Sequence, residues 1–197
     1  MSDAQRPPSP RREELLEHAY RYVLRHGLAD LSLRPLAAAV GSSPRVLLFL
    51  FGSKEALIRA LLARARTDEL ALLDQVQADG IHHDLATVVR TTWRWLADEP
   101  HRPLLTLWLE AYARSLTEPD GPWADFARQT VDDWLAVLAS AQPPDVRLGA
   151  AGTTERTLAL SVLRGALLDL LATGDVDRTT ATVERHLRLI AANGDRN

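Results

Sequence analysis

Apolar residues recur every three to four positions along most of this chain, which is the spacing of an amphipathic α-helix. In the segment from Pro10 to His26, the apolar side chains Leu15, Ala19 and Val23 share one face, while Arg and Glu residues occupy the other. The same period continues toward the C-terminus, and no segment shows the alternation of a β-strand. We therefore predict an all-α fold of nine helices.

Glycine, proline and helix-capping residues divide this pattern into separate helices. After the first helix, the others are expected at about residues 32–40, 43–51, 53 to the high 70s, 84–98, 100–116, 123–140, 153–173 and 176–192. The Asp79-Gly80 pair is expected to end the long fourth helix. Residues 142–152 contain two prolines and two glycines and are predicted to form a loop.

The stretch from Val40 to Leu57 has an unusual sequence of helix ends and starts. Gly41 is expected to end one helix, and Ser43 to cap the next, which has Pro44 in its first position. A second glycine closes this short helix after about two turns. Two helices around a glycine-containing turn, with Arg45 near the start of the second, match the layout of a DNA-reading helix-turn-helix.

Charge is distributed unevenly along the 197 residues, a length that allows one domain or two small ones. The net charge is −3, but residues 1–66 hold 11 Arg and Lys against 6 Asp and Glu, whereas the remainder holds 12 against 20. The N-terminal third is therefore basic on an acidic body, which indicates one end that faces a polyanion.

Several function classes find no support in the composition. The chain has no cysteine, so disulfides and thiolate metal sites are excluded, and no apolar run approaches the roughly 18 residues of a membrane span. The polar, proline-rich start lacks a signal core, so we expect a cytoplasmic protein. His82 and His83 have no third histidine at helical spacing and are predicted to lie in a solvated loop. No catalytic residue, metal or cofactor is predicted, and the chain is not expected to be an enzyme.

A set of residues between 10 and 60 follows the order of a known family. The set comprises Arg12, Leu15, Leu16, Ala19 and Gly27, then Ser32, Leu33, Arg34, Leu36 and Ala37, then Val40-Gly41-Ser42-Ser43, Leu47, Phe51 and Gly52-Ser53-Lys54-Glu55-Ala56-Leu57. In these residues the chain resembles the TetR/AcrR family of bacterial transcriptional regulators.

The resemblance implies a three-helix N-terminal helix-turn-helix DNA-binding domain followed by a six-helix ligand-binding and dimerisation domain. We accordingly expect a flexible tail at residues 1–9, the DNA-binding domain at 10–52 and the helical body at 53–197. It further implies a homodimer on a double-stranded, palindromic DNA operator. The expected function is a repressor that a small apolar or aromatic effector releases, with no membrane partner.

By the same resemblance, the DNA-binding residues are Ser32, Arg34, Ser42, Ser43, Pro44, Arg45, Val46, Leu48, Phe49 and Lys54. The family usually has a tyrosine and often a histidine where this chain has Leu48 and Phe49. Arg45 is therefore predicted to carry most direct base contact, with Val46 and Phe49 against thymine methyl groups. The alternative is a helical ligand- or protein-binding module whose apolar recognition helix no longer reads DNA in the ordinary way.

The body has two further sets of candidates. The effector is expected to contact Trp93, Trp108, Glu110, Tyr112, Trp123 and Phe126, although for any one ring ordinary core packing is the better interpretation. The dimer interface is expected to contain Leu158, Val162, Gly165, Ala166, Leu170, Val183, Leu187 and Ile190, since the last two helices carry more apolar residues than one body helix needs.

Overall fold

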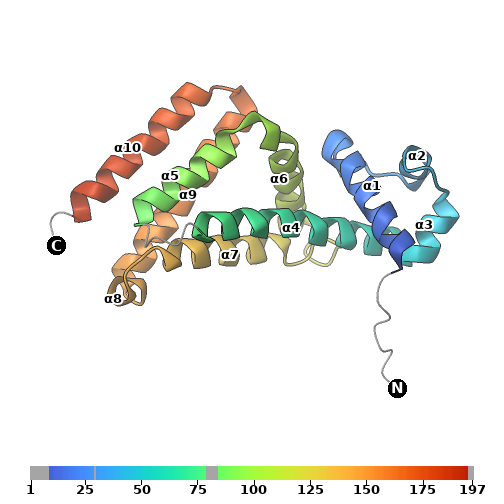
Figure 1. Ribbon diagram of the computed structural model, residues 1–197, viewed down its shortest axis with the longest axis horizontal. Helices are drawn as coiled ribbons and strands as arrows, with labels where there is room; N and C mark the ends of the chain where they lie inside the picture. The colour runs from blue at the N-terminus through green and yellow to red at the C-terminus, as the bar shows by residue number, and fades with distance from the viewer. Residues whose placement is uncertain (1–8, 29, 79–83, 195–197) are drawn as a thin grey trace, which may run out of the picture. The chain divides into compact units, whose positions relative to one another are not determined.

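The computed structural model describes residues 9–28, 30–78 and 84–194, and every regular element within them is a helix (Figure 1). The elements are α1 (Pro10–His26), α2 (Leu33–Ala39), α3 (Pro44–Phe51), α4 (Lys54–Ala78), α5 (Leu85–Ala97), the 3-10 helix η1 (Glu99–His101), α6 (Arg102–Thr117), α7 (Phe126–Ser140), α8 (Pro144–Arg147), α9 (Ala150–Thr173) and α10 (Val176–Gly194). The all-α prediction is confirmed, but the described residues form ten α-helices and one 3-10 helix where nine helices were predicted. The predicted tail, the Asp79-Gly80 helix end and the His82-His83 loop lie wholly or mostly outside the described residues.

The chain forms two compact units. The first comprises Met1–Thr67 with Thr106–Ala127, and the second comprises Asp68–Leu105 with Arg128–Asn197. The first unit is larger than the predicted DNA-binding domain of residues 10–52, because the start of α4 and most of α6 belong to it. The helix α4 continues from one unit into the other along the chain.

Serine side chains set the starts of three helices in the first unit. The hydroxyls of Ser9, Ser43 and Ser53 each accept a hydrogen bond from the backbone N–H three residues later, at 3.3, 3.3 and 3.1 Å. Such caps satisfy N–H groups that a helix start otherwise leaves without a partner. The inner face of α3 is buried through Leu47 and Phe51. The outer face of α3 is thereby left on the surface.

In the second unit, α5, α9 and α10 pack against one another (Figure 1). Two polar contacts join α5 to α10: Trp93 Nε1 donates to Thr180 Oγ1 at 3.0 Å, and Arg90 Nε donates to Glu184 Oε1 at 3.1 Å. Because one side of α9 and α10 packs in this core, only the remaining side of each helix is open to another molecule.

An exposed ion pair fixes the turn between α9 and α10. Arg178 donates to both carboxylate oxygens of Asp169, at 2.6 and 2.8 Å, and also to Asp175 at 3.2 Å. These hydrogen bonds lower the pKa of the Asp169 carboxyl group. The bidentate geometry holds the ends of the two helices in one arrangement.

The prediction of a loop at residues 142–152 is wrong for most of its length. Pro144 opens the one-turn helix α8, where its missing N–H costs nothing, and the Arg147 N–H bonds the Pro143 carbonyl at 2.8 Å. The helix α9 then begins at Ala150. Gly152 is required by close packing, since a Cβ there would lie 2.1 Å from the Val146 carbonyl oxygen. In this segment proline begins a helix and glycine allows close packing, so neither marks a loop.

Candidate functional site

The outer face of α3 carries one charged side chain beside an apolar surface. Arg45 is exposed, and the exposed fractions of Val46, Leu48 and Phe49 are 39%, 41% and 85%. The Phe49 side chain therefore does not pack within its own domain. All four of these predicted DNA-binding residues are placed where a partner can contact them, while Ser42 is half-buried in the turn before α3.

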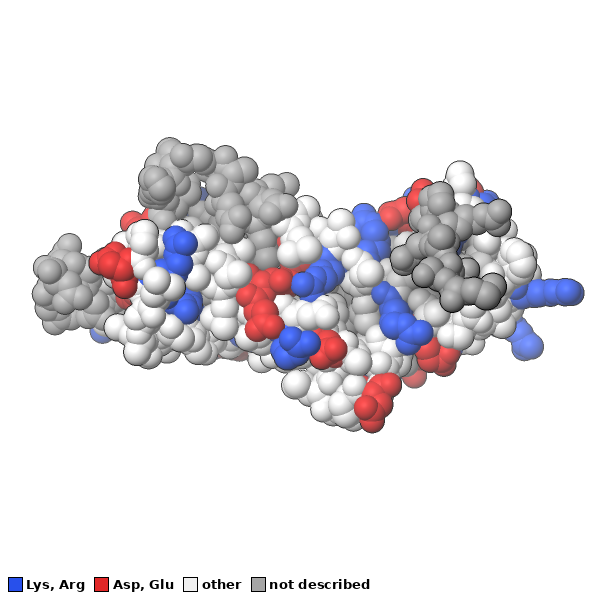
Figure 2. All heavy atoms as spheres, turned by 90° about the horizontal axis from the view of Figure 1, so that it is seen from below, with Lys and Arg blue, Asp and Glu red and all other residues white. Residues whose placement is uncertain are grey.

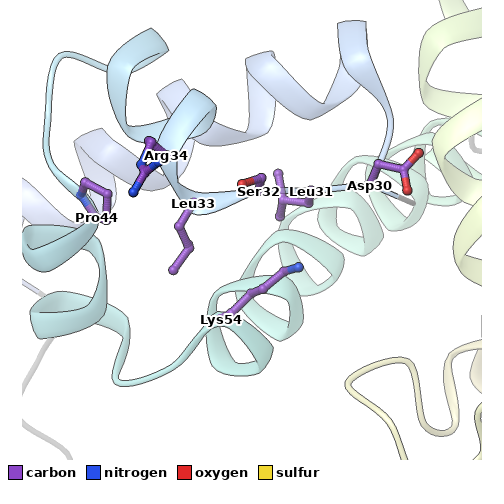
Figure 3. A pocket seen from close by; sticks show the side chains of 7 residues that line it. All are labelled: Asp30, Leu31, Ser32, Leu33, Arg34, Pro44 and Lys54. Carbon is purple, nitrogen blue, oxygen red and sulfur yellow. The ribbon is translucent and has the colours of Figure 1, made fainter.

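A pocket of about 660 Å³ lies beside α3 in the first unit (Figure 3). Its lining residues are Asp30, Leu31, Ser32, Leu33, Arg34, Pro44 and Lys54. They come from the loop before α2, the first turn of α2 and the starts of α3 and α4. Lys54 extends from the start of α4 toward the loop, and Arg34 lies near Pro44 (Figure 3). The structure thus brings together four predicted DNA-binding residues, with two cationic groups among them.

Helix N-termini add donors near this pocket. Ser32 precedes α2 without using its hydroxyl as a helix cap in the described structure, so the hydroxyl remains available. At the start of α4, the pKa of Glu55 is lowered because its carboxylate accepts hydrogen bonds from its own backbone N–H and from Ser53. The start of α4 therefore stabilises negative charge, as helix N-termini generally do.

Basic side chains also project from the surface formed by α1–α3 (Figure 2). Acidic side chains are interspersed with basic ones elsewhere on the face shown (Figure 2). Together with the pocket, this distribution gives the first unit cationic groups around an apolar reading face. Cations at such positions bind a phosphate backbone, whereas the outward side chains of α3 suit base edges.

Three of the predicted effector residues, Trp108, Glu110 and Tyr112, belong to α6 in the first unit. The Trp108 and Tyr112 rings are half-buried, tilted by 33° and separated by 5.1 Å between centroids. Trp123 is buried, and the Arg114 guanidinium lies 5.5 Å from its ring centre. The paired rings of Trp108 and Tyr112 are therefore more accessible than the ring of Trp123.

Phe126, Trp93 and Glu110 of this predicted set have packing roles in the structure. Phe126 is buried in the first unit, and Trp93 is buried in the second, where its indole N–H bonds Thr180. The carboxylate of Glu110 accepts a hydrogen bond from the backbone N–H of Leu28 at 2.7 Å. Glu110 is thus held by the loop after α1, a contact between residues 82 positions apart that the sequence does not reveal.

Sequence reasoning also missed a buried polar pair in the second unit. Trp134 Nε1 donates to Glu69 Oε1 at 2.5 Å, and Glu69 has an exposed fraction of only 6%. A signal was present, because Glu69 falls at a helical spacing from Leu62 and Ala65 on the apolar side of α4. A buried carboxylate requires such a partner, since burial without one is costly.

The structure divides the predicted dimer residues into two groups. Ala166, Leu170, Val183 and Leu187 are buried within the protein's own core, so they are not available to a second copy. Leu158 and Gly165 are exposed, and Val162 and Ile190 are half-buried. The correction has a physical reason: α5 covers part of the apolar surface that the sequence assigns to a partner.

One continuous exposed stripe remains on α9. Its residues are Thr154, Leu158, Ser161, Gly165, Leu168 and Ala172, all exposed and spaced alternately by four and three positions. Leu158 and Leu168 have exposed fractions of 53% and 47%. Around Gly165, a Cβ would meet nothing within 4 Å. Small residues between leucines at this spacing form a surface that a second helix can approach closely.

Comparison with known proteins shows which family has this arrangement. Residues 15–61 match the model of bacterial regulatory proteins of the tetR family. Over 195 residues the chain is 28% identical to the HTH-type transcriptional regulator BetI of Rhizobium meliloti, covering 94% of this chain and 92% of that one. The chain belongs to the TetR family. This TetR-family protein is a DNA-binding transcriptional regulator, and its family is one of regulators rather than enzymes.

Solved structures show the same fold. A transcriptional regulator from Rhodococcus sp. Rha1 has a TM-score of 0.74 at 19% identity, covering 92% of this chain and 96% of its own. The multidrug binding protein EbrR complexed with proflavin has a TM-score of 0.65 at 23% identity, with 91% and 99% covered. Among the described helices of the TetR-family chain, none combines the length and apolar character needed to cross a membrane.

Proposed function

We propose that this protein is a homodimeric repressor that binds a palindromic operator in the bacterial cytoplasm and leaves it when a small apolar or aromatic effector binds. The observation that carries the proposal is the juxtaposition of the outward α3 side chains with the Arg34–Lys54 pocket. In this arrangement α3 lies in the major groove, and Arg34, Lys54 and the start of α4 contact phosphates on either side of the reading helix.

The test is binding to the DNA that flanks the protein's own coding region. We expect a retarded complex whose affinity falls steeply with salt, by a log–log slope of roughly −0.9 per neutralised phosphate. Unrelated duplexes of equal length serve as the control. Equal affinity for both DNAs, or binding that does not change with salt, would contradict the proposal and favour the alternative of a helical module that does not read DNA in the ordinary way.

The apolar part of α3 predicts a dependence on thymine methyl groups. Phe49 has an exposed fraction of 85%, and thymine presents its methyl group in the major groove, where an apolar side chain can pack against it. A bound duplex in which deoxyuridine replaces thymidine loses only these methyls. We expect the replacement to weaken wild-type binding by about tenfold, on the order of 1.4 kcal/mol.

The matched variant is Phe49→Ala measured on both duplexes. If Phe49 contacts the methyls, Phe49→Ala binds the two duplexes with nearly equal affinity, because the interacting side chain is absent. Competition titrations at one salt concentration give the four dissociation constants. A wild-type protein that does not distinguish the duplexes would assign Phe49 to a protein partner instead.

The proposed dimer interface is the exposed stripe of α9. A twofold axis places each stripe against its copy, so Leu158 and Leu168 are buried while Ser161 and Gly165 allow the backbones to approach. A dimer also matches a palindromic operator, because two recognition helices then reach half-sites one helical turn apart. Val162 and Ile190, which are also expected in the interface, are half-buried.

The proposed effector contacts the Trp108–Tyr112 pair on α6. Two half-buried rings whose centroids lie 5.1 Å apart suit a flat aromatic molecule, which packs against their faces. A structural neighbour, EbrR, binds proflavin, and this supports the aromatic class without naming the ligand. Effector binding favours an arrangement with lower DNA affinity, so the same coupling makes DNA weaken effector binding.

A further inference from the structure

A carboxylate on helix α6 holds the loop after α1. Glu110 Oε2 accepts the Leu28 N–H at 2.7 Å, and a Cβ on Gly27 would lie 3.3 Å from the same oxygen. We propose that Glu110 is a positioning residue, which holds the DNA-phosphate pocket in its binding arrangement and links that pocket to the aromatic pair on α6. The inference rests on the proposed use of the pocket and assigns Glu110 a role outside effector contact.

The sequence around Gly27 explains why an acceptor is needed there. Gly27 ends α1 with φ of +78°, and its own N–H bonds the Val23 carbonyl at 2.8 Å. The next N–H, that of Leu28, is part-buried and bonds Glu110 on α6, while the Leu28 side chain is buried. A buried N–H without an acceptor is costly, and a charged acceptor makes a stronger hydrogen bond than a neutral one. Glu110 satisfies this group from α6.

The anchored loop leads directly into the pocket. Leu31 is buried and its N–H bonds the Leu28 carbonyl at 3.1 Å, so the position of Leu28 determines that of Leu31. Asp30, Leu31 and Ser32 then line the pocket that holds Lys54. Release of the Leu28 N–H therefore loosens the segment that places Ser32 and the first turn of α2 against phosphate.

Glu110 and the aromatic pair occupy opposite sides of α6. Trp108 and Tyr112 are four residues apart and share one face, whereas Glu110 lies two residues from each, about 200° around the helix. A molecule that packs against the rings and shifts or turns α6 must also move the carboxylate relative to Leu28. A local change on one face of α6 thereby reaches the phosphate pocket through the hydrogen bond between Glu110 and Leu28.

The first experiment compares Glu110→Ala with Glu110→Gln. The probe is a duplex selected from a random DNA pool by the wild-type protein, and the readouts are operator affinity and amide exchange of Leu28 by NMR. We expect Glu110→Ala to weaken DNA binding by about tenfold and to accelerate Leu28 exchange by a similar factor. Glu110→Gln should stay within about twofold in both, because its side-chain oxygen can accept the same N–H.

Two further variants separate this role from general stability. Glu118→Ala removes another α6-adjacent carboxylate, which pairs with Arg114 at 2.7 Å, and should change neither readout. If Glu110→Ala does not fold, Glu110→Asp takes its place. It keeps the charge but shortens the side chain, so it should weaken DNA binding and accelerate Leu28 exchange in the same way. If the wild type selects no duplex, the proposed function fails. If it does and Glu110→Ala retains affinity and Leu28 protection, the inference is overturned.

A double-mutant cycle tests the link across α6. Tyr112→Ala alters the aromatic face, and its effect on operator affinity is measured with Glu110 present and with Glu110→Ala. Coupling through the carboxylate predicts that the Tyr112→Ala effect shrinks at least threefold in the Glu110→Ala background. Effects that multiply independently would overturn the transmission of the change through Glu110.

Discussion

Gly165→Glu is expected to convert the protein from a dimer to a monomer and to weaken operator binding by at least about a hundredfold. The position tolerates the side chain within one protomer, because a Cβ there meets nothing within 4 Å. In a dimer through the α9 stripe, however, two carboxylates would be buried against each other at the point of closest approach. Losing the second recognition helix removes the advantage of bivalent binding. Light scattering and DNA titration measure the two effects.

Two controls define what this result means. Gly165→Ala adds only a methyl group and should leave dimerisation intact, with unfolding stability raised by roughly 0.5–1 kcal/mol because alanine favours a helix. Ala136→Glu adds the same charge at an exposed position of α7, away from the stripe. If Gly165→Glu remains dimeric by light scattering, the interface lies on another surface and the proposed stripe is wrong.

The DNA-binding domain was largely predictable because its signals are local. Ser43 and Pro44 mark the start of α3, and Gly41 and Gly52 flank it, so four residue choices agree on one helix. The outward positions of α3 follow from its period once Leu47 and Phe51 are assigned to the core. Local capping and a single buried face determine this part of the site.

The body was less predictable because its contacts are distant along the chain. The apolar residues of α9 and α10 indicate buried surface, but the periodicity does not say whether α5 or a second copy covers it. Trp93, which bonds Thr180 across 87 positions, shows that α5 covers part of it. Glu110 illustrates the same limit. Its neighbours Trp108 and Tyr112 favour an effector role, whereas its actual donor is the Leu28 N–H.

Arg45→Ala and Lys54→Ala are expected to weaken DNA binding in two different ways. Arg45 is exposed on the outer face of α3, where its guanidinium can bond a guanine edge at two atoms. Its loss should cost about 1–3 kcal/mol on the operator and relax the preference at one base pair of each half-site. Lys54 lies in the pocket beside α2, so its loss should weaken operator and unrelated DNA alike.

The salt dependence separates the two roles. Removing a phosphate contact lowers the magnitude of the log–log salt slope by about one per subunit, so Lys54→Ala should show a flatter dependence than wild type. Arg45→Ala should change mainly the ratio of operator to unrelated affinity. The substitution Arg45→Lys keeps the charge but loses the planar two-point donor. It should therefore also lower the preference for operator over unrelated DNA. An Arg45→Ala protein that keeps full selectivity would show that Phe49 and DNA shape carry the recognition, since few other outward polar groups remain on α3.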